Sequence, residues 1–201
     1  KYLQMACSTS RSNTIVFLGK IIETKGAFSL IKAFCSIASK YPNINLIMIG
    51  GGKIRAAQSL IDDQYRGRIK FTGYLSREEI KQKISSSLFC AIPSYFENFS
   101  LAAMEVMACG KALIYTNRAS GPELINDKVN GLLVDPENVC QIASAIEFLL
   151  NNLEQCQQMG LEAQKTILHT FSENVVMEQI ENYYKSCINS HRKNDTSSNN
   201  K

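Results

Sequence analysis

Short apolar runs alternate along the chain with longer stretches in which apolar residues recur every three or four positions. The runs have the length of buried strands, and the spacing in the longer stretches is that of amphipathic helices. The runs predict strands at residues 14–18, 44–49, 69–72, 88–92, 112–115 and 131–134. The helical spacing predicts helices at residues 26–40, 100–110, 122–126, 138–150, 153–168 and 172–188. It also predicts one helix that follows the glycines 50–52 and ends near residue 62, and another that begins at residue 76.

This alternation predicts an α/β fold. Short, continuously apolar strands separated by helices indicate a parallel sheet that is covered on both faces. Right-handed crossovers then give a Rossmann-like, doubly wound sheet of about six strands. In such folds ligands bind beyond the carboxyl ends of the strands. We expect that edge to carry Gly19, the glycines 50–52, Gly73 and the turn at residues 93–98.

Length and composition set the domain organisation. The 201 residues suffice for one domain with a full core or for two small ones, and 45% hydrophobic residues is ordinary for a globular protein. We expect one domain at residues 14–188. Residues 1–13 are expected to be a linker or the truncated end of a longer chain. The composition of residues 189–201 predicts a disordered tail.

Charge, cysteines and histidines argue against several classes of protein. The net charge of +4 comes with no basic run in the expected domain, which argues against a nucleic-acid partner. No apolar stretch approaches the ~20 residues of a membrane-spanning helix, and no signal peptide opens the chain. The seven cysteines are scattered without a C-x-x-C pair, as in a reduced, cytoplasmic protein. His169 and His191 lack neighbours at ligand spacing, so we expect no metal site.

Two glutamates flank a strand-to-helix junction. Glu97 lies in the turn after the strand at 88–92, and Glu105 lies inside the helix that begins near Ser100. The N–H groups at the start of such a helix attract phosphate. The two carboxylates therefore bracket a place for a phosphate with attached sugars. The alternative is that they are ordinary acidic residues, which complement the dipole at many helix starts.

Three further features belong to the same edge of the sheet. Lys20 and Lys25 lie on the loop after the first strand, where two ammonium groups can flank a diphosphate, although loop lysines are more often simply solvated. Leu75, after Gly73, is suited either to contact a nucleobase or to pack at the start of the next helix. The glycines 50–52 lack the G-x-G-x-x-G spacing of a nicotinamide site and are better explained as a tight turn.

In this order the motifs resemble the C-terminal half of the group 1 (family 4) glycosyltransferases. The resemblance extends from about Thr14 to Ile188, and the pair Glu97 and Glu105, with seven residues between them, is the signature of that family. The other matching segments are Gly19-Lys20, Lys25-Gly26, residues 47–52, 71–73, Pro93-Ser94, residues 107–111, Pro122-Glu123 and residues 130–134.

The resemblance implies a role for each matching residue. Glu97 is the catalytic carboxylate on the donor sugar, and Glu105 holds the ribose. Lys20 and Lys25 contact the diphosphate, and Leu75 contacts the nucleobase. Backbone N–H groups that meet the diphosphate come from Phe99, Ser100 and Leu101. The sequence departs from the family at Lys20, where arginine is usual, at Asn98 and Ser100, where glycine is frequent, and at Ala112, where proline is usual.

The resemblance also implies a GT-B fold, in which two Rossmann-like domains face each other across a cleft. The expected function is the donor-binding domain of a retaining, metal-independent glycosyltransferase that uses no cofactor. It transfers a sugar from a UDP-linked donor to a glycan or lipid-linked acceptor in polysaccharide biosynthesis. No residues match the N-terminal domain, which carries the acceptor site, so this domain by itself is expected to be inactive.

Several alternatives stay open. The chain is either an excised part or one subunit of a split enzyme, and a non-catalytic nucleotide-sugar-binding module fits the same residues. A GT-B epimerase would need a histidine-rich site that finds no counterpart. The base, sugar, acceptor, linkage and oligomeric state are not determined by the sequence. Peripheral association of the full enzyme with the inner face of the membrane is compatible with the resemblance.

Overall fold

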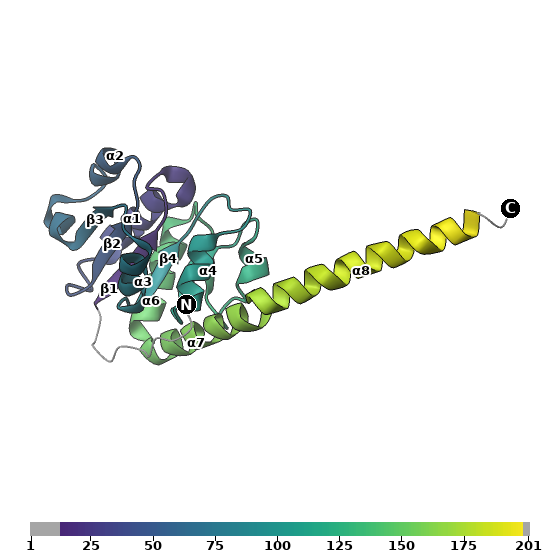
Figure 1. Cartoon of the computed structure of the whole chain (residues 1–201). Coiled ribbons are helices and arrows are strands. Elements are labelled where there is room, and N and C mark those ends of the chain that lie inside the picture. The colour runs from purple at the N-terminus through teal and green to yellow at the C-terminus, as the bar shows by residue number, and fades with distance from the viewer. Residues whose placement is uncertain (1–12, 199–201) are drawn as a thin grey trace. The chain divides into compact units, whose positions relative to one another are not determined.

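The computed structural model describes residues 13–198, with side chains as far as residue 188, so the predicted linker lies almost wholly outside the described residues. Strands and helices alternate as the apolar pattern predicts (Figure 1). The strands are β1 (Thr14–Leu18), β2 (Asn45–Ile49), β3 (Ile69–Gly73), β4 (Phe89–Ile92), β5 (Leu113–Thr116) and β6 (Leu132–Val134). The helices are η1 (Glu23–Lys25), α1 (Ala27–Ile37), α2 (Ile54–Gln58), η2 (Asp63–Arg68), α3 (Arg77–Ser85), α4 (Leu101–Ala108), α5 (Gly121–Leu124), α6 (Val139–Asn151), α7 (Leu153–Thr170) and α8 (Glu173–Ser198).

The six strands form one parallel sheet in the order β3-β2-β1-β4-β5-β6. β1 pairs along its whole length with β2, from Thr14 opposite Asn45 to Leu18 opposite Ile49. The chain first adds strands outward from β1 to β3, and then returns to place β4 on the other side of β1. This is the predicted doubly wound arrangement. Its switch point lies between β1 and β4, so the loops after these two strands border the crevice in which such folds bind ligands.

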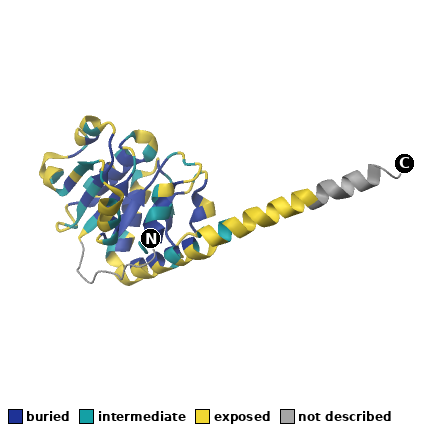
Figure 2. Cartoon of the chain, viewed as in Figure 1, coloured by how far each residue is buried: buried dark blue, intermediate teal, exposed yellow. Residues whose placement is uncertain are grey.

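Helices cover both faces of the sheet. Helices α1 and α6 pack against each other over one face, where Ile15 and Phe17 of β1 belong to the main hydrophobic core. Val16, between them, is also fully buried and points to the other face because side chains alternate along a strand. Right-handed crossovers place α3 and α4 there. Figure 2 shows the result, with buried strands and with helices whose outer surfaces are exposed.

Two helices end three or more residues earlier than the pattern predicts. Helix α1 stops at Ile37 instead of residue 40, and α2 stops at Gln58 instead of about residue 62. The guanidinium of Arg68 donates hydrogen bonds to the carbonyls of Ala38, Tyr41 and Ile44. These bonds satisfy carbonyls of the segment that follows α1, where the chain has left the helical hydrogen-bond pattern.

The described chain divides into two units between Lys165 and Thr166. The first unit contains the sheet, its covering helices and the start of α7. The second contains the end of α7 and helix α8, which continues beyond the predicted range of 172–188 to Ser198 and so enters the segment whose composition predicts disorder. Because all six strands belong to the first unit, the site described below is built from that unit alone.

Candidate functional site

Backbone hydrogen bonds join the loops that follow β1, β2 and β3. The N–H of Gly19 donates to the carbonyl of Ile49 over 3.0 Å, and that of Gly50 donates to the carbonyl of Gly73 over 2.9 Å. Gly50 has a φ of +134°, and a Cβ atom there would lie 2.1 Å from the carbonyl oxygen of Gly19. Only glycine allows this approach. The glycines that we expected at the carboxyl edge therefore lie in contact there.

These loops form a hollow of about 370 Å³ that contains two of the predicted site residues, Lys20 and Leu75. Its walls also include the backbone of Gly50 and Gly51 and the ring of Tyr74. A Cβ atom on Gly51 would lie 2.7 Å from the Tyr74 ring, so this ring packs directly on the glycine backbone. Leu75 was predicted from the sequence and Tyr74 was not, because an aromatic residue in a loop carries no local sign of its neighbours.

An ion pair joins the loops after β1 and β4. Nζ of Lys25, at the end of η1, donates to Oε1 of Glu97 over 2.8 Å. The side chains of Lys25 and Glu97 remain 33% and 13% exposed. The sequence assigned the two residues to different parts of the ligand, whereas the structure places them in direct contact. An ammonium group has three donors, so Lys25 can keep this bond and still donate to an anion.

The β4–α4 loop that carries Glu97 is fastened to the β1–α1 loop through its backbone as well. The N–H of Tyr95 donates to the carbonyl of Thr24 over 2.9 Å, and Oγ of Ser94 donates to the same carbonyl over 3.1 Å. The hydroxyl of Tyr95 lies 3.1 Å from Oγ of Ser29 on α1. The position of Glu97 is thus set by the loop on the other side of the switch point.

A glycine makes this contact between the loops possible. Gly26 has a φ of +71°, and a Cβ atom there would lie 1.8 Å from the carbonyl oxygen of Pro93. We expect Gly26→Ala to lower the free energy of unfolding by roughly 2–5 kcal/mol, from left-handed backbone strain and overpacking. Urea unfolding measures the change.

Gly67→Ala is the matched control for this substitution, because a Cβ atom at Gly67 meets nothing within 4 Å. We expect its unfolding free energy to stay within about 0.5 kcal/mol of the parent value. Equal stability of the Gly26 and Gly67 variants would contradict the close contact between Gly26 and Pro93.

The β5–α5 loop holds the Glu97 loop from the other side. Oγ of Ser120 donates to the main-chain carbonyl of Glu97 over 3.1 Å, and the N–H of Ser120 lies 3.4 Å from the same oxygen. In the same loop Arg118 pairs with Asp135 and Glu137 over 2.8 and 2.9 Å, and its guanidinium lies 5.7 Å from the centre of the Tyr95 ring. Neither Ser120 nor Arg118 was predicted from the sequence, since nothing in their local pattern distinguishes them from other loop residues.

Helix α4 starts directly after this loop. Ser100 is its N-cap, and its buried hydroxyl accepts a hydrogen bond from the N–H of Ala103 over 3.3 Å. The first bond within the helix backbone is donated by Met104 to Ser100, so the N–H groups of the first turn lie at the open end of the helix. Phe99 and Leu101, beside the cap, are exposed. The helix end that we expected to meet a diphosphate is therefore at the surface beside Glu97.

Glu105, the second signature glutamate, lies on α4 and is half-buried. Helix α4 has no acidic residue in its first turn, so neither glutamate acts as an ordinary dipole partner within that turn. This weakens the alternative explanation of the pair.

A buried phenol lies beneath the Glu97 loop. Tyr115, near the end of β5, has no exposed surface, and its hydroxyl lacks a hydrogen-bond partner of good geometry among the described residues. Burial raises the pKa of Tyr115, the nearby hydroxyls of Ser100 and Ser120 oppose that increase, and the Glu97 carboxylate adds to it. The hydroxyl group therefore stays protonated at neutral pH, as a hydrogen-bond donor.

The cysteines that fall in apolar patterns behave as core residues. Burial raises the pKa of the Cys90 thiol to about 12 and that of Cys156 to about 11, and it also raises the pKa values of Cys35 and Cys109. Protonated thiols of this kind are poor nucleophiles. We therefore assign no chemistry to these cysteines.

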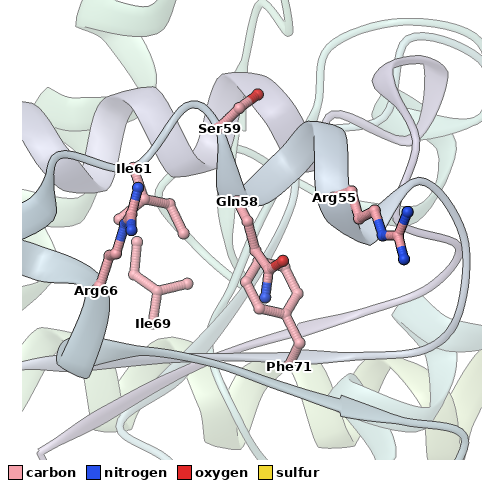
Figure 3. A pocket seen from close by; sticks show the side chains of 7 residues that line it. All are labelled: Arg55, Gln58, Ser59, Ile61, Arg66, Ile69 and Phe71. Atoms are coloured by element: carbon pink, nitrogen blue, oxygen red, sulfur yellow. The ribbon is translucent and has the colours of Figure 1, made fainter.

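A second hollow, of about 410 Å³, lies against the edge strand β3 (Figure 3). In that view the side chain of Gln58, on α2, is directed toward β3 and overlaps the ring of Phe71, whereas Arg55 points away from them. None of the predicted site residues line this hollow. It borders the middle of a strand and not the carboxyl ends, so its position does not favour it as the main ligand site.

The described residues contain neither a metal-binding cluster nor a membrane-spanning helix. No cluster of three or more histidine, cysteine, aspartate or glutamate side chains among them has the arrangement of a metal site. In the same part of the chain, no helix combines the length and apolar character needed to cross a membrane.

Comparison with known sequences identifies a family. The sequence model of the family described as "Glycosyl transferases group 1" matches residues 8–166. An uncharacterized glycosyltransferase of Methanocaldococcus jannaschii is 27% identical over 173 residues, which are 85% of this chain and 44% of that protein. A D-inositol 3-phosphate glycosyltransferase of a Mycobacterium species is 31% identical over 148 residues, 70% of this chain and 33% of that protein. The chain therefore spans less than half the length of these curated relatives.

Solved structures agree with the sequence match. The C-terminal domain of a group 1 family glycosyl transferase from Francisella tularensis superposes with a TM-score of 0.72 at 27% identity, covering 80% of this chain and 86% of that one. HepE of Anabaena, solved in complex with UDP, gives a TM-score of 0.78 at 22% identity, covering 88% of this chain and 50% of that one. At the lower identity the likeness concerns the fold alone.

Proposed function

Because the chain belongs to the group 1 glycosyltransferases, as a C-terminal donor-binding domain of GT-B fold, we propose that it binds a UDP-linked sugar for a retaining transfer that requires no metal. The observation that carries this proposal is the Lys25–Glu97 ion pair, which lies at the start of α4. The pair places a cation for the diphosphate, Lys25, in direct contact with a carboxylate for the sugar, Glu97.

Each part of the donor is assigned to a different group of residues. The nucleobase occupies the hollow beside Leu75 and Tyr74, where backbone and ring surfaces suit a flat ligand. Glu105 accepts hydrogen bonds from the ribose hydroxyls. The diphosphate lies between Lys20, Lys25 and the N–H groups at the start of α4, at the helix end that attracts anions.

In the transfer itself the bond between the anomeric carbon and the diphosphate oxygen breaks, the new glycosidic bond forms to the acceptor oxygen, and the proton of the acceptor hydroxyl passes to the departing diphosphate. Negative charge grows on the departing diphosphate, where Lys25 and the first turn of α4 stabilise it. Glu97 accepts hydrogen bonds from the sugar hydroxyls and fixes the anomeric carbon relative to the leaving group. Because Glu97 is bonded to Lys25, the position of the sugar is coupled to the position of the phosphates.

The choice of UDP rests on relatives. HepE binds UDP and UDP-glucose in its solved complexes. The acceptor is less defined, because similar proteins include a D-inositol 3-phosphate glycosyltransferase and a 2-deoxystreptamine N-acetyl-D-glucosaminyltransferase. We propose a glycan or lipid-linked acceptor, held by a second domain across the cleft of the GT-B fold.

Calorimetric titration in the presence of a chelator tests the donor site. We expect UDP to bind with a dissociation constant between roughly micromolar and millimolar, since one open wall of a cleft leaves part of the ligand in water. GDP and ADP are titrated in parallel to identify the base. The absence of any binding heat with all three at millimolar concentration would exclude the proposed site.

A pair of lysine variants locates the phosphates in the same assay. Lys25→Ala is expected to weaken UDP without changing the affinity for uridine. Lys40→Ala is the matched control, because Lys40 forms an ion pair of equal length, 2.8 Å, with Glu147 away from the sheet edge. Equal effects of the two substitutions on UDP would place the diphosphate elsewhere.

A further inference from the structure

We propose that Ser120 is a positioning residue that sets the sugar-binding carboxylate of Glu97 through its main chain. This inference rests on the proposed function, since it concerns the sugar half of the donor. Ser120 itself is buried, so its side chain acts on the ligand only through the β4–α4 loop.

The contact is specific in its geometry. Ser120 lies in the β5–α5 loop and directs both its Oγ and its N–H at one acceptor, the carbonyl oxygen of Glu97. That carbonyl belongs to the residue whose side chain pairs with Lys25. Glu97 is therefore held at two points, with the carboxylate bound to the β1–α1 loop and the carbonyl bound to the β5–α5 loop.

The turn before Ser120 adopts a conformation that favours glycine. Ala119 has a φ of +49°, in the left-handed region that non-glycine residues seldom occupy. Such a conformation persists only when the surrounding contacts impose it. The two bonds from Ser120 to Glu97, together with the pairing of Arg118 with Asp135 and Glu137, are contacts of this kind.

The hydroxyl of Tyr115 lies near that of Ser120. A serine hydroxyl donates one hydrogen bond and accepts two, and Ser120 uses its donor on Glu97. The buried hydroxyl of Tyr115 has no hydrogen-bond partner of good geometry in the described residues. It lies near the hydroxyls of Ser100 and Ser120, which oppose the increase that burial causes in the pKa of Tyr115. This protonated hydroxyl is therefore a polar neighbour both of the N-cap of α4 and of the residue that contacts Glu97.

The test compares the affinities of variants for UDP and for two nucleotide sugars, UDP-glucose and UDP-N-acetylglucosamine. The informative quantity is the ratio of the affinity for the better sugar nucleotide to the affinity for UDP. Ser120→Ala is expected to lower this ratio about 2- to 10-fold, the effect of one lost hydrogen bond, while leaving UDP itself within about twofold of the parent. Ser120→Thr keeps the hydroxyl and should restore most of the ratio.

Ser87→Ala serves as the matched control, because Ser87 is also buried and donates one hydroxyl hydrogen bond to a carbonyl, that of Ile84. It should leave the ratio unchanged. If Ser120→Ala keeps the parent ratio, or weakens UDP and the sugar nucleotides equally, the positioning role is wrong. A parent chain that binds UDP and both sugars equally would overturn it too, whereas a parent chain that binds none of the three refutes the proposed function instead.

Discussion

The 201-residue polypeptide by itself is expected to form no acceptor-linked product from any nucleotide sugar. In the proposed function the site residues form a single wall, which binds the donor at the carboxyl edge of one sheet. Transfer also requires an acceptor hydroxyl held against the anomeric carbon in a place that excludes water. Positioning of this kind contributes about 7–11 kcal/mol to lowering a barrier, which corresponds to a rate factor on the order of 10⁵–10⁸.

The measurement is product formation with a panel of nucleotide sugars and acceptors, by the chain alone and by the chain fused behind the N-terminal domain of a group 1 relative. Slow release of free sugar from the donor is compatible with the half-site, because water needs no acceptor pocket. Acceptor-dependent product from the unfused chain would overturn the prediction. A fusion that binds UDP-sugar but transfers nothing would favour a non-catalytic binding module.

The fold was predictable because its signals are local. Each apolar run marks a strand within one or two residues, since a strand buried on both faces must be apolar along its whole length. The helix predicted from residue 76 onward begins at Ser76, where Ser76 and Glu79 form a capping box with both of its hydrogen bonds. The ends of α1 and α2 were not predictable in the same way. Arg68 fixes the end of α1 through carbonyl contacts, and no periodicity near residue 38 reveals an arginine thirty residues farther along.

The site was predictable as far as the sheet topology determines it. A doubly wound sheet brings the ends of β1, β2 and β3 to one edge, and Lys20 and Leu75 do line one hollow there. The topology does not determine which side chains pair across that edge. Lys25 and Glu97 are 72 residues apart, and the bond from Ser120 to Glu97 joins two loops without any sequence signal. The assignments of all eight predicted site residues to parts of the ligand remain predictions.

The ion pair changes what the two lysines and two glutamates should do as a group. The sequence predicts that Lys25 contacts the diphosphate and that Glu97 contacts the sugar, independently of each other. In the structure a change to either residue alters the partner, so their effects should not add. Lys20, which is exposed and lines the hollow, is the cation whose effect on the diphosphate should be separable from Glu97.

Glu105→Gln is expected to weaken UDP about 10- to 150-fold, because a hydrogen bond to a charged acceptor contributes roughly 1.5–3 kcal/mol. Glu97→Gln is expected to act differently. It removes the partner of Lys25, which leaves the ammonium free to turn to the diphosphate, so UDP should bind as well as to the parent or more tightly. The ratio of the affinity for the sugar nucleotides to the affinity for UDP should fall, because the amide cannot replace a carboxylate as a charged acceptor for sugar hydroxyls.

Titration of both variants with UDP and with UDP-glucose measures the difference, and Glu147→Gln provides the control. Glu147 also accepts a 2.8 Å bond from a lysine, Lys40, away from the sheet edge, so the same substitution there should change neither affinity. Equal weakening of UDP by the changes at Glu97 and Glu105 would mean that both carboxylates face the nucleotide. That result would place the donor sugar beyond Glu97, and the catalytic role would then have to belong to another residue.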